Sequence, residues 1–215
     1  MTTNPQDLIN FFTKVGQLKK IKRTGWVLRG VREPESIADH SFRLALMAWI
    51  FGQGKQLDIP RVIKMALVHD LCEVFAGDAT PYDEWVGEGK HTDDRQVFNR
   101  WPLRLTKEEK ERRASSKRGK EASSLEKVVK ELPEDLRDEI VGLWTEYEEG
   151  LTREAALVRQ IDKMENMISA CEYQLEDEEL PIRSFWVQLK ESVDDPDLVK
   201  FLEVLDRHYN VSLKK

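Results

Sequence analysis

The sequence predicts an all-α protein, a helical bundle of about seven to nine helices. Two observations favour this fold class. Apolar residues recur at intervals of three and four along most of the chain, which is the helical period. Residues that cap helices, such as Asn, Asp, Thr, Pro and Gly, stand at the borders of these segments. We find no internal repeat and no convincing strand pattern in the 215 residues.

The expected helices follow one another with short connections. A first helix over 4–20 carries an apolar stripe and precedes a basic loop over 19–32. The further helices are expected over 37–51, 61–77, 106–130, 133–149, 152–171, 182–192 and 196–209. Capping residues support several of these borders: Asp58 and Gly77 for the third helix, and Thr152 for the long helix near the end.

The helix expected over 61–77 is apolar on most sides, yet it carries His69, Asp70 and Glu73. Burying unpaired charge is costly, so these side chains need compensation. His69 and Glu73 are four residues apart and would share a helix face. A second apolar helix carries His40, one of only four histidines in the chain. A His–Asp pair is commonly an ordinary hydrogen-bonded pair, but two buried histidines on two helices suggest a shared divalent-metal site of the Zn, Mn, Fe, Co or Ni type.

Composition limits the remaining functions. The net charge of −6 does not favour nucleic acid or an anionic membrane. Two cysteines are too few for a disulfide scaffold, and there is no apolar run of membrane-spanning length and no basic-then-apolar leader. We therefore expect a cytoplasmic protein, with a nuclear location as the other option, and no membrane partner.

Two stretches have less certain roles. Residues 83–105 show no clean period and contain three large aromatic residues, so we expect an irregular or partly helical stretch that packs, as a surface segment or a lid. Residues 104–120 hold eight Lys or Arg against three Glu. A solvated helix face explains this charge better than a nucleic-acid patch, because aromatic residues are not interleaved with the basic ones.

The motifs resemble those of HD-domain 5′-deoxynucleotidases, and most closely the eukaryotic HD-domain-containing protein 2 group. His40, His69-Asp70 and Asp162 follow the H…HD…D order of HD phosphohydrolases. The segments that carry the further likeness are Thr24-Gly25-Trp26, Pro34 to Ser41, Ala66 to Asp70, Glu73, Gly77-Asp78 and Leu132 to Arg137. The resemblance covers about residues 8–205. It implies that residues 1–215 form a single HD domain, in which 83–105 is longer than the family's usual segment.

The resemblance also implies site residues. The metal ligands would be His40, His69, Asp70 and Asp162; spacing alone would not reveal Asp162. Glu73 and Asp78 would be the catalytic acids, with Glu73 orienting the nucleophilic water and Asp78 passing a proton to the leaving oxygen, or the two exchanged. Glu73, Asp78 and Ala79 would also form a second cation site, with Mg²⁺ as one candidate. These roles are what the family implies.

The basic loop would bind the substrate. Trp26 matches a family tryptophan linked to preference for deoxyribose. The arginine that directly precedes it in bacterial members is replaced by Gly25, so Arg23, Arg29 or Arg32 would meet the phosphate.

The resemblance implies hydrolysis of deoxyribonucleoside 5′-monophosphates by a metal-dependent enzyme that forms a homodimer. Two alternatives stay open. Another HD phosphohydrolase would act on cyclic nucleotides or nucleoside triphosphates. A non-catalytic metal-binding scaffold would keep the ligands as a relic, although the complete ligand set and both acids weigh against it.

Overall fold

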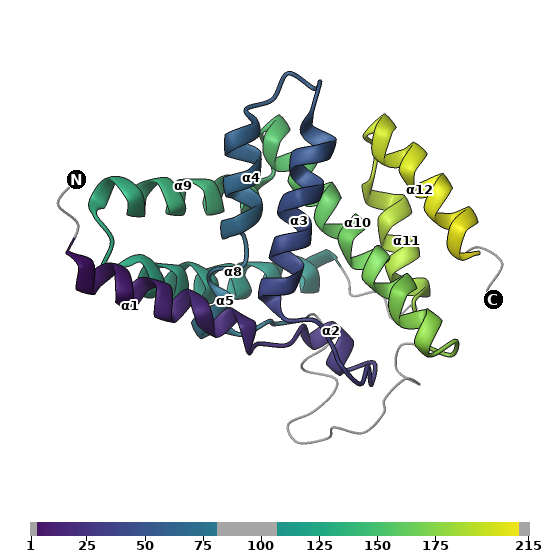
Figure 1. Cartoon of the computed structure of the whole chain (residues 1–215), viewed down its shortest axis with the longest axis horizontal. Coiled ribbons are helices and arrows are strands. Elements are labelled where there is room, and N and C mark those ends of the chain that lie inside the picture. The colour runs from purple at the N-terminus through teal and green to yellow at the C-terminus, as the bar shows by residue number, and fades with distance from the viewer. Residues whose placement is uncertain (1–3, 81–106, 211–215) are drawn as a thin grey trace. The chain divides into compact units, whose positions relative to one another are not determined.

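The structure is a computed structural model that describes residues 4–80 and 107–210, except for the side chains of residues 107–116 and 184. The chain divides into two compact units, one with Met1–Ser41 and Val68–Thr145, the other with Phe42–Leu67 and Glu146–Lys215. Helices α3 (Ile37–Gly52), α4 (Ile59–Val68) and α9 (Glu134–Glu149) contribute residues to both. Within the described ranges there are helices, turns and one isolated bridge between Lys22 and Ser36, so the all-α prediction is confirmed (Figure 1).

The first unit is organised around a long helix, α8 (Lys107–Val129). Helix α1 (Pro5–Val15) begins at Asn4, whose side chain accepts a hydrogen bond from the amide of Gln6, and it packs beside α8 (Figure 1). Lys14 of α1 donates to the carbonyl of Lys127 at 3.2 Å and pairs with Glu131. The short helix η1 (Gly16–Lys19) and the single helical turns α2 (Thr24–Val27) and α5 (Glu73–Ala76) complete this unit.

The core of the first unit forms where α8 meets α5 and α1. Apolar side chains recur on the inward face of α8 at helical spacing, and they are buried there. The buried apolar residues of the unit include Phe11, Leu18, Trp26, Leu71, Leu125, Val128, Val129, Leu132, Leu143 and Trp144. This packing fixes α5, and with it the turn just before α5 that carries His69 and Asp70.

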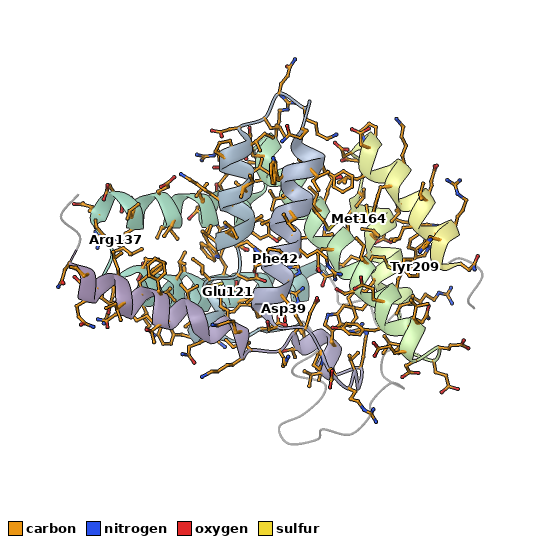
Figure 2. All side chains as sticks on the ribbon, in the orientation of Figure 1. Asp39, Phe42, Glu121, Arg137, Met164 and Tyr209 are labelled. Carbon is orange, nitrogen blue, oxygen red and sulfur yellow. The ribbon has the colours of Figure 1, made fainter. Side chains whose placement is uncertain are left out.

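The second unit is built on α10 (Arg153–Glu176), against which α11 (Arg183–Ser192) and α12 (Pro196–Tyr209) pack. Thr152 caps α10 by accepting a hydrogen bond from the amide of Ala155 at 3.1 Å, as the sequence predicted. Met164 of α10 is completely buried (Figure 2). The other buried apolar residues of this helix include Leu157, Val158, Ile161, Met167, Ala170 and Cys171.

A buried ion-pair network ties α3 to α10 inside the second unit. Glu165 is completely buried, and the Arg43 Nε donates to its Oε1 at 2.7 Å. Arg43 also donates from Nη1 to Glu172 at 2.7 Å, and from Nη2 to the Ser169 hydroxyl. A buried carboxylate without such partners would destabilise the fold by several kcal/mol, on the order of 3–5 kcal/mol. The network therefore compensates the charge of Glu165 directly.

Two expectations fall partly or wholly outside the described ranges. The insertion expected over 83–105 lies in the undescribed segment, as does Thr106 of the expected helix start. Within the described part of the chain, no helix combines the length and apolar character needed to cross a membrane.

Candidate metal centre

The His–Asp motif lies in a turn, and here the structure corrects one prediction. The sequence favoured one continuous helix over 61–77, but α4 ends at Val68 and α5 starts at Glu73. In the turn the amide of Leu71 donates to the Val68 carbonyl at 3.1 Å, and that of Glu73 to the Asp70 carbonyl, also at 3.1 Å. Each of these hydrogen bonds joins residues three apart, as in a 3₁₀ helix, whereas an α-helix joins residues four apart. His69 and Glu73 therefore do not share one helix face.

The other borders of this segment agree with the sequence. The Asp58 side chain accepts a hydrogen bond from the amide of Arg61 at 3.0 Å at the start of α4. Gly77 ends α5 with φ 72°, in the left-handed region that glycine enters without strain. The turn that Gly77 makes leads directly to Asp78, the second predicted acid.

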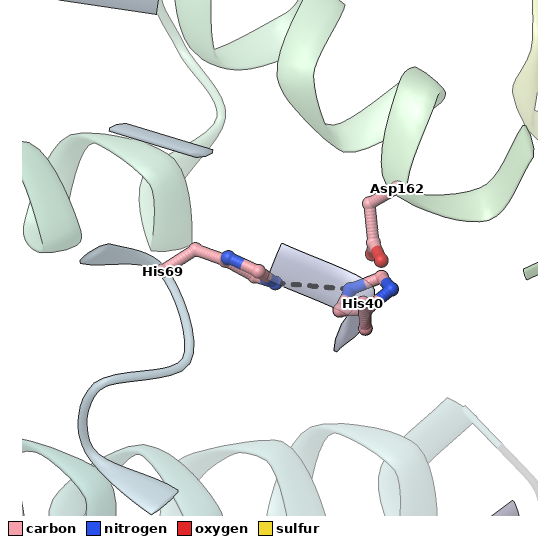
Figure 3. Close-up of side chains that lie close together, drawn as sticks. All are labelled: His40, His69 and Asp162. Atoms are coloured by element: carbon pink, nitrogen blue, oxygen red, sulfur yellow. Dashed lines mark hydrogen bonds between the residues drawn. The ribbon is translucent and has the colours of Figure 1, made fainter. Parts of the chain in front are cut away.

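The structure brings His40, His69 and Asp70 together within the first unit. His40 comes from the first turns of α3, and its Nε2 lies 3.3 Å from the Nε2 of His69 (Figure 3). The Oδ2 of Asp70 lies 3.0 Å from Nε2 of His69 and 3.9 Å from Nε2 of His40. Both rings are buried, with exposed fractions of 0% and 3%. Nε2 of His40, Nε2 of His69 and Oδ2 of Asp70 thus form a triangle of potential ligand atoms, and both rings in it are shielded from solvent.

This triangle fits a divalent ion. Ligand atoms bound at about 2.0–2.2 Å in tetrahedral or octahedral geometry lie roughly 3.0–3.6 Å from one another. The two shorter sides of the triangle fall in this range, and the third exceeds it by a few tenths of an ångström. Two imidazoles and a carboxylate are ligands that suit Zn, Mn, Fe, Co or Ni. The donor set and its spacing agree with the metal site that the sequence predicted.

Asp70 is held in its charged form. Burial alone would raise its pKa, but the charges and hydrogen bond of the neighbouring His69 ring, together with Arg23 and His40, hold the pKa of Asp70 well below its usual range. The Nη1 of Arg23 lies 3.2 Å from Oδ2 of Asp70. An ionised Asp70 is the form that a metal ion requires of a carboxylate ligand.

Glu73 has the opposite electrostatic character. It is 3% exposed, and its Oε2 is buried without a hydrogen-bond partner among the described residues. Burial, together with the charges of Asp70 and Asp78, raises the pKa of Glu73 far above its usual range, although Arg23 and Lys117 oppose the shift. A buried carboxyl with an unpaired oxygen is costly for folding, and such groups concentrate at functional sites.

Asp78 faces the same part of the first unit. Its Oδ2 accepts a hydrogen bond from the backbone amide of Thr24 at 2.6 Å, so the turn α2 and the predicted acid are joined. Burial raises the pKa of Asp78, and Arg23 and the Thr24 amide oppose that shift. Ala79, predicted to share a second cation site, follows in the irregular segment 77–80 and is half-buried.

The predicted substrate residues differ in their surroundings. Arg23 contacts Asp70 directly. Arg29 is buried, and its Nη1 donates to the carbonyl of Gly25 at 2.8 Å. Trp26 is only 1% exposed, and its indole N–H donates to Oε1 of Glu35 at 2.9 Å. Among Arg23, Arg29 and Trp26, Arg23 is the side chain that contacts a member of the triangle, Asp70.

Asp162 lies on α10, in the second unit. There its carboxylate accepts hydrogen bonds from the Tyr147 hydroxyl at 3.1 Å and from the Asn166 amide at 3.2 Å. These two neighbours fix the rotamer of Asp162 within its own unit. Its assignment as a metal ligand remains a prediction.

Helix α8 contributes residues that the sequence reasoning missed. The Ser124 hydroxyl donates to the carbonyl of Cys72, the residue before Glu73. Glu121 is 6% exposed and pairs with Lys117 at 3.3 Å. A sequence signal existed, because Glu121, Ser124, Leu125 and Val128 recur at helical spacing. The charge of residues 104–120 favours a solvated face, and no local pattern connects the residues after them with the site.

A protein-family model described as an HD domain matches residues 15–195. The chain belongs to the HD-domain family. The matched range includes His40, the His69–Asp70 pair and Asp162, so the resemblance drawn from these motifs is confirmed.

Named relatives of this HD domain are similar over most of the chain. The 5′-deoxynucleotidase HDDC2 of Mus musculus is 35% identical over 207 residues, which cover 96% of this chain and 90% of the mouse protein. The 5′-deoxynucleotidase HDDC2 of Dictyostelium discoideum is 37% identical over 179 residues, with 80% of each chain covered. Among solved structures, the PH0347 protein from Pyrococcus horikoshii OT3 shares 29% identity, with a TM-score of 0.64 over 94% of this chain and 97% of that protein.

Proposed function

We propose that this HD-domain protein is a metal-dependent 5′-deoxynucleotidase that hydrolyses deoxyribonucleoside 5′-monophosphates to deoxynucleosides and phosphate. The observation that carries the proposal is the buried triangle of His40, His69 and Asp70, followed in the chain by the buried carboxyl of Glu73, whose Oε2 has no hydrogen-bond partner among the described residues. The relatives named 5′-deoxynucleotidase support the reaction class, because they match nearly the whole chain. A scaffold function and other HD phosphohydrolase activities are less well supported.

His40, His69 and Asp70 would hold the ion, with Asp162 as the fourth ligand. The assignment of Asp162 rests on the H…HD…D order of the family. A divalent ion in such a site supplies an acidified water and polarises the phosphoryl group. Zn, Mn, Fe, Co and Ni all suit the donor set.

The two acids would handle the protons. Glu73, whose pKa is raised, is suited to hold a proton or to orient the attacking water. Asp78, whose pKa is raised less strongly, would deliver a proton to the leaving 5′-oxygen, and the two roles could be exchanged. Together with the carbonyl of Ala79 they would also hold a second cation, for which Mg²⁺ is suited as a hard ion with oxygen ligands.

The basic loop would bind the nucleotide. Arg23 already lies at the triangle, and its guanidinium can donate two parallel hydrogen bonds to a phosphate. Arg29 and Trp26 would act behind it, by holding the turn α2 and the sugar side of the site; the bond between Trp26 and Glu35 supports such a positioning role.

We expect phosphate release from deoxyribonucleoside monophosphates with added Co²⁺ or Mn²⁺, and slower release from the ribonucleotides. The assay compares the purified chain with the Asp70→Ala variant, which would lose a ligand. Release from cyclic nucleotides or triphosphates instead would favour the alternative HD activities. A chain that binds metal stoichiometrically but hydrolyses none of these compounds would contradict the proposal.

The whole chain would act as one HD domain over residues 1–215, including an insertion at about 83–105, and as a homodimer. An apolar stripe on α3 supports a dimer: Phe42, which Figure 2 labels, and Leu46, Trp49 and Ile50 are 40–65% exposed. Stripes of this kind on soluble proteins commonly mark interaction surfaces. Sedimentation at the monomer mass of 25.1 kDa across micromolar concentrations would contradict the dimer.

The protein would work in the cytoplasm or the nucleus, where thiols stay reduced. Cys72 and Cys171 are both buried and neither forms a disulfide, which agrees with such a compartment.

A further inference from the structure

Helix α8 carries Lys117 one turn before Glu121, on a helix that packs on α5. One face of α8 packs on α5, and residues spaced three or four apart share such a face. The residues at this spacing are Lys117, Glu121, Ser124 and Val128. Ser124, one turn beyond Glu121, bonds to the Cys72 carbonyl, and Val128 is completely buried. Lys117 is therefore the exposed residue at the N-terminal end of this set, whose member Ser124 bonds to the turn before α5.

The pair between Lys117 and Glu121 is more than a surface contact. Glu121 is 6% exposed (Figure 2 shows it on α8), whereas the Lys117 side chain is 46% exposed. The buried partner restricts the lysine, and the lysine remains accessible to a ligand from solvent. An ammonium group has three donors, and Glu121 at 3.3 Å needs only one of them.

The charge of Lys117 acts on the site itself. It opposes the rise in the pKa of Glu73 and of Asp78, and the charges of Glu73 and Asp70 act in turn on Lys117. The described part of the site contains the carboxyls of Asp70, Glu73 and Asp78. A phosphate dianion approaching these groups would be repelled unless cations offset them. Arg23 is one such cation, and its Nη1 already lies next to Asp70.

We propose that Lys117 binds the phosphate group of the substrate, with Glu121 as the positioning residue that holds the lysine. The inference rests on the proposed function, because it assigns one phosphate contact to that site. The shared chemistry is that of a phosphomonoester dianion, and free inorganic phosphate carries the same chemistry. Lysine suits this task as a compact point charge that can donate to more than one phosphate oxygen.

The test compares Lys117→Gln with Lys120→Gln, which removes the same charge three residues further along the same helix. We expect Lys117→Gln to raise KM for a deoxyribonucleoside monophosphate and the inhibition constant of inorganic phosphate, each by about 10- to 100-fold, as expected for the loss of a charge-assisted hydrogen bond. Lys120→Gln should change both by less than about twofold. Lys117→Arg should recover most of the binding, because it keeps the cation.

A purely structural role would give a different pattern. In that case Lys117→Gln would lower the melting temperature and the bound metal, and the inhibition constant of phosphate would follow the amount of folded protein. Equal constants for Lys117→Gln and Lys120→Gln would overturn the proposal. If the Gln variant does not fold, the Glu121→Gln variant takes its place, with a smaller rise in KM expected and an unchanged KM counting against the proposal.

A calorimetric titration with inorganic phosphate separates this inference from the proposed function. A wild-type chain that hydrolyses no deoxynucleotide would sink the proposed function. If that chain still bound phosphate and Lys117→Gln weakened the binding, the phosphate site would stand. Normal hydrolysis with phosphate binding unaffected by Lys117→Gln would sink the phosphate site alone.

Discussion

At the scale of single residues, the surroundings of Asp70 and Glu73 shift the pKa values of these two neighbouring carboxyls in opposite directions. Asp70 lies against His69 and Arg23, and its pKa is held well below the usual range. Glu73, three residues later, is buried with an unpaired oxygen, and its pKa is raised. The physical cause is the local balance of burial against positive charge. One carboxyl is thereby prepared to hold a cation and the other to handle a proton.

Glu73→Gln tests this division. We expect turnover to fall by at least about 100-fold, which is the lower range for loss of a general acid or base. The metal-free variant should unfold at the same or a higher temperature than the metal-free wild type, because an amide avoids the cost of an unpaired buried carboxyl, about 1–3 kcal/mol. Paired assays of phosphate release and thermal unfolding measure both effects. A strongly destabilised variant would mean that Glu73 serves the fold.

At the scale of elements, the start of α12 shows how one carboxylate serves two purposes. Oδ1 of Asp195 accepts hydrogen bonds from the amides of Asp197 and Leu198, at 3.0 and 3.2 Å. The ammonium of Lys55 lies 2.9 Å from both oxygens of Asp195. Burial opposes the ionised form, but the bond to Lys55 and the two amides outweigh it and lower the pKa of Asp195 below 3.8.

This arrangement predicts a graded loss of stability. Asp195→Ala removes both the cap and the ion pair and should cost about 1–2 kcal/mol, whereas Asp195→Asn keeps an acceptor for the cap and should cost roughly half as much. About 1 kcal/mol corresponds to roughly 2–4 °C in melting temperature for a chain of this size. Thermal unfolding of the two variants beside wild type measures the difference. Equal losses would show that the ion pair contributes everything.

The pH dependence follows from the depressed pKa. The stability due to the Asp195 charge is complete above the unfolded value of 3.8 and is lost as the pH falls through the lower folded value. The gap between wild type and Asp195→Asn should therefore be constant from pH 7 to 5 and narrow below pH 3.8. Urea unfolding at several pH values checks this, and a gap that widens in acid would contradict it.

At the scale of the whole molecule, the metal ion would link distant parts of the sequence. If His40, His69, Asp70 and Asp162 hold one ion, as proposed, its binding would stabilise the folded chain against unfolding. We expect Co²⁺ or Mn²⁺ at about 100 times its dissociation constant to stabilise the metal-free chain by about 2.7 kcal/mol. Thermal unfolding with and without chelator measures this.

Variants identify the ligands in the same experiment. Asp70→Ala and Asp162→Ala should each lose most of the metal-dependent rise in melting temperature. Asp138→Ala, which removes an aspartate that is 70% exposed on α9, should keep it. A full metal response in Asp162→Ala would remove this residue from the proposed ligand set and leave the histidine-rich triangle as the site.

Much of this HD domain was predictable from local patterns. Asp58 and Thr152 begin helices where the sequence placed them, because a cap depends only on residues two or three positions away. The break at His69–Cys72 was not predictable in this way. Its helical period continues unbroken through the turn, and the Ser124 hydroxyl that binds the Cys72 carbonyl is 52 residues away.

The sequence by itself determined the all-α class, several helix starts and the residue types that can hold a divalent ion, since periodicity, capping and ligand chemistry are all local properties. Only the tertiary structure decided that His40 and His69 face each other at 3.3 Å, that Glu73 keeps an unpaired oxygen and that Lys117 pairs with the buried Glu121. Distances and burial depend on how α3, α5 and α8 pack, and packing joins residues that no short-range pattern connects.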